Sequence, residues 1–151
     1  MNLRLMRMLV FSLCVLGGLL LSTIHVLAEE DAFVENSIEG VWLTKSKDQV
    51  RIDMKNNQPE GIGLDLPGVE PRKDVLNPDE SLRDRFLHDV VILKDFVYQG
   101  KGRWAKGTIY DPNNGKTYQC LLRMKSDSEL MVRGYIGVSL IGRTEIWTRI
   151  E

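Results

Sequence analysis

The stretch "EGVWLTK" (Glu39 to Lys45) places a Gly two residues before a Trp, at the start of the first predicted strand. Because glycine has no Cβ, Gly40 lets the strand bend while Trp42 fills the space at that end of a sheet. The last predicted strand carries "EIWTRIE" (Glu145 to Glu151), in which Arg149 can lie over the indole face of Trp42. Such a contact contributes roughly 0.5–2 kcal/mol. The two ends of the chain are therefore expected to meet and close one end of the fold.

Between these ends, apolar and polar residues alternate, as is typical of antiparallel strands with one wet face. Eight strands are predicted, at 38–44, 49–55, 60–66, 89–97, 103–110, 116–124, 129–134 and 143–150. In "NPDESLRDR", Asn77 as a cap, Pro78 at the first helical position and Glu80 in a capping box predict one short helix, with an apolar face of Leu82, Phe86 and Leu87. The fold class is all-β, a single antiparallel up-and-down barrel of about eight strands with one short helix. The Gly-x-Trp on the first strand and the basic residue on the last resemble lipocalin-like (calycin) barrels.

The first 28 residues predict an export signal. Arg4 and Arg7 form a short basic region, residues 8–28 carry no formal charge, and "VLA" at 26–28 offers the small residues that a signal peptidase reads. An uncleaved anchor is the alternative, because such a segment could just span a bilayer. After cleavage, no stable membrane span is expected. The predicted organisation is a signal peptide at 1–28, an acidic leader at 29–37 and the barrel at 38–151, in a periplasmic or secreted protein.

Composition and single residues exclude several classes of function. The formal net charge of −1 offers no basic surface for nucleic acid. Cys120 and His88 are the only Cys and His after residue 28, so no disulfide can form within that part of the chain. A lone Cys on an apolar strand face is expected to be buried and structural. Without a cluster of metal ligands or a nucleophile motif, we expect no metal, no cofactor and no catalytic residue.

An eight-stranded barrel encloses room for one small ligand or for side chains alone. The residues that alternate inward on three of the predicted strands are the candidates to contact a ligand. They are Val50, Ile52, Met54, Tyr118, Met124, Leu130 and Val132. The expected ligand is a small apolar molecule or a lipid, although the same residues could equally form a filled core.

The run "GYIGVSLIG" (134–142) is unusually apolar for a connection between strands. Its large side chains are Tyr135, Ile136, Val138, Leu140 and Ile141. One interpretation is a plug buried at the barrel mouth against the helix. The other is a ligand lid or a surface for a partner such as an envelope protein, because exposed apolar patches mark contact sites.

Four runs together, "GVWLT", "NPDESLRDR", "GRWAKGTIYDPNNGKTY" and "VRGYIGVSLIGRTEIWTR", resemble a bacterial family of exported proteins, domain-of-unknown-function family 2147. The resemblance implies export, a small lipocalin-like barrel and small-molecule binding, and it brings no established reaction. Positions that look recurrent in that family are Asn77, Asp79, Arg83, Asp111, Tyr118, Arg143 and Thr144. Caps, turns and strand ends explain most of them, so none is assigned a catalytic role.

Three functions follow from the sequence. The leading one is an exported carrier of a small apolar ligand. The alternative is a filled barrel that acts as an envelope protein-interaction module. The third is an enzyme that uses polar groups at the barrel mouth, such as Arg143, Tyr110 and His88.

Overall fold

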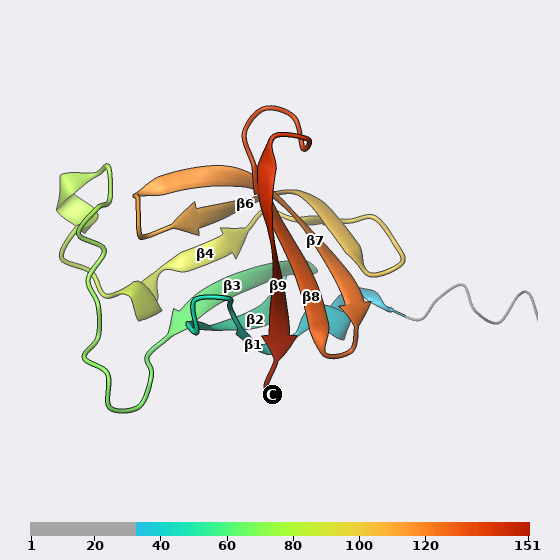
Figure 1. The fold of residues 1–151 in the computed structure, drawn as a ribbon, viewed down its shortest axis with the longest axis horizontal. Helices are drawn as coiled ribbons and strands as arrows, with labels where there is room; N and C mark the ends of the chain where they lie inside the picture. Colours follow the sequence, from blue (N-terminus) through green and yellow to red (C-terminus); the bar gives the residue numbers. More distant parts are fainter. Residues whose placement is uncertain (1–32) are drawn as a thin grey trace, which may run out of the picture. The chain divides into compact units, whose positions relative to one another are not determined.

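The computed structural model describes residues 33–151, and the predicted export signal lies outside the described residues. The described chain is all-β (Figure 1). Its nine strands are β1 (Gly40–Leu43), β2 (Gln49–Lys55), β3 (Gln58–Leu64), β4 (Val91–Lys94), β5 (Val97–Tyr98), β6 (Arg103–Asp111), β7 (Lys116–Ser126), β8 (Glu129–Tyr135) and β9 (Gly142–Arg149). Three short 3-10 turns accompany them, η1 (Glu35–Ile38), η2 (Glu80–Leu82) and η3 (Leu87–Asp89). Within residues 33–151, no helix is long and apolar enough to cross a membrane.

Eight of the strands close into an antiparallel barrel. Neighbouring strands pair in the order β4-β3-β2-β1-β9-β8-β7-β6, and β4 pairs with β6 to complete the circle. The short β5 adds to β6 outside this circle. Strands β1 and β9 meet through two pairs, of which Trp42 with Arg149 is one. Closure leaves no free edge on these eight strands, which removes the aggregation risk of an open sheet.

One end of the barrel is filled by side chains. Trp42, Trp104, Phe96 and Leu130 are fully or almost fully buried in a single core cluster. The 3-10 turn η1 lies under this cluster, because Ile38 is buried and its carbonyl accepts a hydrogen bond of 2.9 Å from Trp42 Nε1. We call this the closed end. The opposite end, where the β1–β2, β3–β4, β6–β7 and β8–β9 connections lie, is the mouth.

The structure corrects the expectation of a short helix. Only the turns η2 and η3 occur between residues 77 and 89, and Leu82 and Phe86 are exposed rather than packed on a helical face. Asn77 does not cap a helix, because its side chain is drawn into contacts with the backbone of Asp79 and with Asp74. Asp79 caps η2 instead and accepts a hydrogen bond from Ser81 N.

Two predicted boundaries also differ. The predicted strand 89–97 is interrupted after Lys94, because Asp95 has a φ of +65° and Phe96 turns into the core. Part of the predicted acidic leader belongs to the fold. Phe33 packs against the core, and its carbonyl accepts a hydrogen bond of 2.8 Å from Tyr98 Oη.

Candidate functional site

A cavity of about 700 Å³ occupies the mouth half of the barrel. Its apolar wall includes Val50 of β2, Ile109 of β6, Val132 of β8 and Trp147 of β9. Val50, Val132 and Trp147 are almost completely buried, so the wall is formed by the barrel itself rather than by mobile surface groups. The barrel is therefore filled at the closed end and hollow toward the mouth.

Strand β9 contributes a polar line to this cavity. Alternate residues of a strand point to the same face, and Arg143, Glu145 and Trp147 all line the cavity. Arg143 Nη2 lies 2.9 Å from Glu145 Oε1, and Trp147 Nε1 donates a hydrogen bond of 3.3 Å to Glu145 Oε2. The Arg143 side chain is 78 % exposed whereas that of Glu145 is only 24 % exposed. The cavity thus becomes less polar from its rim inward.

The seven residues predicted to contact a ligand divide into two groups. Val50, Tyr118 and Val132 line the cavity, and of these Val50 and Val132 also belong to the core cluster. Ile52, Met124 and Leu130 are buried in the core cluster, and Met54 packs against it. All seven lie on the predicted strands, but strand alternation alone did not separate cavity from core.

The β8–β9 connection between Tyr135 and Gly142 projects from the mouth (Figure 1). Ile136 and Ile141 line the rim of the cavity but remain well exposed, and Leu140 is 88 % exposed. Val138 is exposed as well. The loop is therefore not a plug buried against a helix, which corrects that interpretation.

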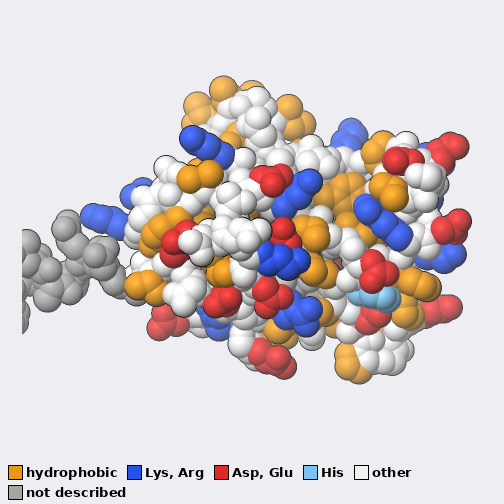
Figure 2. All heavy atoms as spheres, turned by 180° about the vertical axis from the view of Figure 1, so that it is seen from behind, with side chains coloured by type: hydrophobic (Ala, Val, Ile, Leu, Met, Phe, Trp, Pro, Cys, Tyr) orange, Lys and Arg blue, Asp and Glu red, His pale blue; other side chains and the backbone are white. Residues whose placement is uncertain are grey.

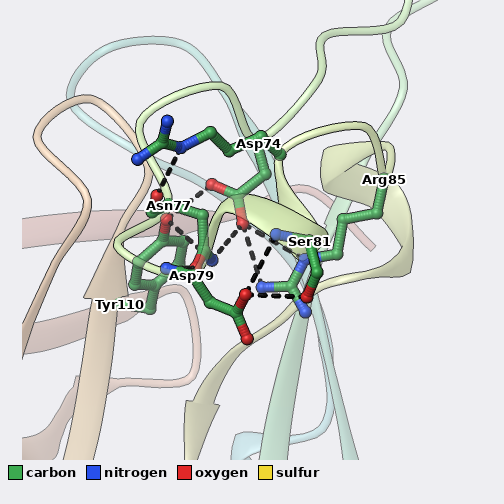
Figure 3. A network of polar contacts seen from close by, with 7 residues as sticks. Asp74, Asn77, Asp79, Ser81, Arg85 and Tyr110 are labelled. Carbon is green, nitrogen blue, oxygen red and sulfur yellow. Dashed lines mark hydrogen bonds and ion pairs between the residues drawn. The ribbon is translucent and has the colours of Figure 1, made fainter.

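A buried carboxylate lies beside the mouth, in the long β3–β4 connection (Figure 3). Asp74 is completely buried, and its Oδ1 accepts a hydrogen bond of 2.5 Å from Tyr110 Oη of β6. Its Oδ2 accepts hydrogen bonds from Asn77 Nδ2 at 2.8 Å and from Arg85 Nη2 at 2.9 Å. A buried charge is tolerated only when it is paired and hydrogen-bonded in this way. The network fixes the β3–β4 connection to the end of β6.

The network also sets the proton affinity of its members. Burial by itself raises the pKa of Asp74, but the hydrogen bonds from Tyr110, Asn77 and Arg85 outweigh it and bring the pKa below its ordinary value. Burial, together with the hydrogen bond to Asp74, raises the pKa of Tyr110 to about 12. Tyr110 therefore keeps its proton at neutral pH and acts as a hydrogen-bond donor.

A second contact joins the same two segments. Gly115, in the β6–β7 turn, has a φ of +68° and faces the carbonyl of Leu76 so closely that a Cβ has no room there.

The positions that look recurrent in the family mostly have structural partners. Thr144 of β9 accepts a hydrogen bond of 2.6 Å from Arg133 Nη1 of β8. Three other recurrent positions hold turns and connections: Arg83 Nε donates a hydrogen bond to the Asn77 carbonyl, and Asp111 Oδ1 accepts one from Asn113 N. Sequence reasoning missed Asp74, because nothing local indicates that its partner lies on β6.

The groups considered for an enzymatic role all line the cavity, and each lies close to another side chain. Tyr110 serves the Asp74 network, Arg143 pairs with Glu145, and His88 Nδ1 lies 2.7 Å from Asp65 Oδ2. Cys120 is completely buried, and burial raises its pKa to about 12. Among residues 33–151, no group of three His, Cys, Asp or Glu side chains is arranged to hold a metal ion.

Residues 40–149 match the model of a bacterial protein family, described as an uncharacterized protein conserved in bacteria (DUF2147). The chain belongs to this family. The match begins at Gly40 of the Gly-x-Trp stretch and ends at Arg149, so it spans the whole barrel. No curated protein matches the chain.

The fold is also similar to a solved structure, the protein HP1028 from the human pathogen Helicobacter pylori, which is described as a lipocalin family member. The two are 27 % identical, with a TM-score of 0.71, over 76 % of this chain and 83 % of that one. The DUF2147 barrel described here is thus lipocalin-like.

Proposed function

We propose that this DUF2147 protein is an exported carrier that holds a small, largely apolar molecule or lipid in the mouth half of its barrel. The observation that carries the proposal is the cavity of about 700 Å³. Pockets that enclose small molecules have volumes of about 300–1,000 Å³ and are lined mostly by apolar side chains with a few polar groups. Lipocalin-like barrels of eight strands are wide enough for one such ligand.

The lining defines how a ligand would lie. Val50, Val132 and Trp147 offer an apolar surface in the interior, where a hydrocarbon or aromatic body loses its contact with water. Arg143 and Glu145 stand nearer the rim and offer both a donor and an acceptor. A ligand with an apolar body and one polar end therefore fits best, with the polar end toward the mouth.

Export to the periplasm or beyond the cell is part of the proposal. Its support is the sequence of residues 1–28, with a basic start, an uncharged centre and small residues at 26 and 28. Cell fractionation with a mass measurement tests it. A mature N-terminus at Glu29 in the periplasm or medium is expected, and a full-length chain in the cytosol would contradict export.

The alternative from the sequence, an envelope interaction module, is favoured by one observation, the exposed apolar β8–β9 loop. That alternative assumed a barrel filled by side chains throughout, but only the closed end is filled. No reaction is proposed: Tyr110 donates a hydrogen bond to Asp74, Arg143 pairs with Glu145, and His88 Nδ1 faces Asp65 without forming a hydrogen bond.

The decisive experiment is to purify the exported protein from its native compartment and record its mass under native and denaturing conditions. A native adduct that dissociates on denaturation supports the carrier and gives the mass of the ligand. If only the bare mass appears, the emptied protein is exposed to a fluorescent fatty acid and to a matched fatty amine. Binding of neither probe would contradict the carrier function.

A further inference from the structure

The β8–β9 loop combines four features that together define the surface it can contact. Its nine residues "GYIGVSLIG" (134–142) contain no charged side chain, although 27 % of the chain's residues are charged. Ile136 and Leu140 are 66 % and 88 % exposed, and Val138 and Ile141 are exposed too. Figure 2 shows these apolar side chains gathered on the projection at the top of the molecule. A soluble protein normally keeps such a patch covered.

The second feature is that the loop has a fixed shape. Arg133 Nε donates a hydrogen bond of 2.8 Å to the Ser139 carbonyl, and its Nη2 donates to the Ser139 and Leu140 carbonyls. The amide of Ile141 bonds to the Val138 carbonyl, and that of Ile136 to the Ile141 carbonyl. Backbone groups that are already paired can enter an apolar medium at low cost, whereas unpaired ones cannot.

The third feature is the position of charge. Arg133 and Arg143 flank the apolar run, so two Arg residues lie at the base of the loop, and from there the Arg133 guanidinium reaches the Ser139 and Leu140 carbonyls. An apolar tip with Arg at its base is the arrangement of a segment that dips into a bilayer, where basic side chains remain at the level of the headgroups. Tyr135, between Arg133 and the tip, is a residue type enriched at that level.

The fourth feature is the location. Ile136 and Ile141 belong both to this loop and to the rim of the cavity. We propose that the β8–β9 loop is a membrane-docking element that inserts its tip, Ile136 to Ile141, into the surface of a lipid bilayer. A second copy of the chain or another protein would need about 800 Å² of surface per partner, and a projecting loop with four large apolar side chains is small for that. Docking would also place the cavity mouth against the bilayer, where a ligand could pass between the lipid and the cavity. This second role, in ligand exchange, rests on the proposed carrier function.

The test uses the chain from Glu29, which contains the whole compact unit Phe33–Glu151. Its binding to phosphatidylglycerol–phosphatidylethanolamine vesicles is measured by flotation. The double variant Val138→Ser/Leu140→Ser is expected to lose tenfold or more in vesicle affinity, because each side chain is largely exposed, does not line the cavity and would otherwise be buried in lipid. The matched control is Val34→Ser, which removes an exposed apolar side chain at the closed end and should bind vesicles within twofold of wild type.

Folding is checked by circular dichroism and thermal melting, and both variants should match wild type because the replaced side chains are exposed. Wild-type protein that fails to float with vesicles, or a double variant that binds as well as wild type, would overturn the proposal. So would a wild-type dimer that becomes monomeric in the double variant without any vesicle binding. Uptake of the fluorescent fatty acid in vesicle-free solution separates the two functions. If the double variant loses vesicle binding but takes up the probe as wild type does, docking and carriage are both supported. If the double variant loses vesicle binding and even the wild type takes up no probe, docking alone is supported.

Discussion

The guanidinium carbon of Arg149 lies 4.3 Å from the ring centroid of Trp42, and the same side chain reaches three backbone carbonyls. Its Nη2 donates a hydrogen bond of 2.5 Å to Ser37 and its Nε one of 2.6 Å to Asp127, while Nη1 donates to Glu39. One residue of the last strand therefore joins the turn η1, the first strand and the β7–β8 connection. This cluster closes the end of the barrel opposite the cavity.

Arg149→Ala is expected to destabilise the protein by about 2–4 kcal/mol, because it removes both the contact with Trp42 and the hydrogen bonds to the three carbonyls. For a domain of this size that corresponds to a fall in melting temperature of about ten degrees. Arg143→Ala is the matched control. Its side chain is 78 % exposed and makes one ion pair, so its effect should stay below about 1 kcal/mol. Urea unfolding measures both, and equal effects would contradict the structural role of Arg149.

Local sequence rules predicted the strands and the closed end well, for a physical reason. Alternation of apolar and polar residues reports which side chains face inward, and Gly40, Trp42 and Arg149 are specialised residue types at the two ends of the chain. The same rules failed at Asn77, where a capping pattern predicted a helix. There a contact with Asp74 competes for the side chain and holds the segment in turns. Tertiary contacts of this kind leave no local signal.

The candidate site was predictable only in part. Val50 and Ile52 have the same parity on β2 and both belong to the core cluster, yet only Val50 reaches the cavity. The boundary between core and cavity depends on how far Trp42, Phe96 and Trp104 fill the closed end. It therefore depends on the pairing of strands that brings these three side chains together. Likewise, Tyr110 was identified as a polar group at the mouth, but its partner Asp74 is 36 residues away in the sequence.

Tyr110→Phe should destabilise the protein by about 1–2 kcal/mol, because it leaves a buried carboxylate oxygen without its donor. Tyr118→Phe is a suitable control on the neighbouring strand. Its hydroxyl meets only the exposed Asn114 side chain in the described part of the chain, and the expected change is within about 0.5 kcal/mol. Chemical unfolding of both variants measures the difference. If the two substitutions have the same effect, the Asp74 network does not stabilise the fold.

The stability should depend on pH through Asp74. Its pKa in the folded protein is lowered, so its contribution is present above the unfolded value of about 3.9 and is lost as pH falls through the folded pKa. Asp74→Asn should therefore be less stable than wild type at pH 7, by about 2 kcal/mol. Below about pH 4 the wild type should lose stability more steeply than the variant. Urea unfolding from pH 7 to pH 3 tests this, and parallel curves would contradict it.

Cys120 should be inert in the folded protein. Its thiol is completely buried, and its pKa is raised to about 12, so the reactive thiolate is scarce at neutral pH. In the chain from Glu29, a maleimide or an aromatic disulfide reagent should label Cys120 only after denaturation. Rapid labelling of the native protein at pH 7 would show that the β7 face opens readily.

Val132→Trp should abolish ligand uptake while leaving the barrel folded. Val132 lies on β8 beside Glu145 of β9 and lines the cavity, so an indole at this position would occupy part of the space that a ligand needs. Leu130, two residues along the same strand, is completely buried in the core, and Leu130→Trp would therefore overpack the closed end and cost about 1–3 kcal/mol instead. Ile146→Trp is the matched control, because Ile146 is exposed and points outward on β9 between Glu145 and Trp147. Titration with the fluorescent fatty acid should give at least a tenfold loss of affinity for Val132→Trp and none for Ile146→Trp. Equal affinity in the two folded variants would mean that the ligand binds outside this cavity.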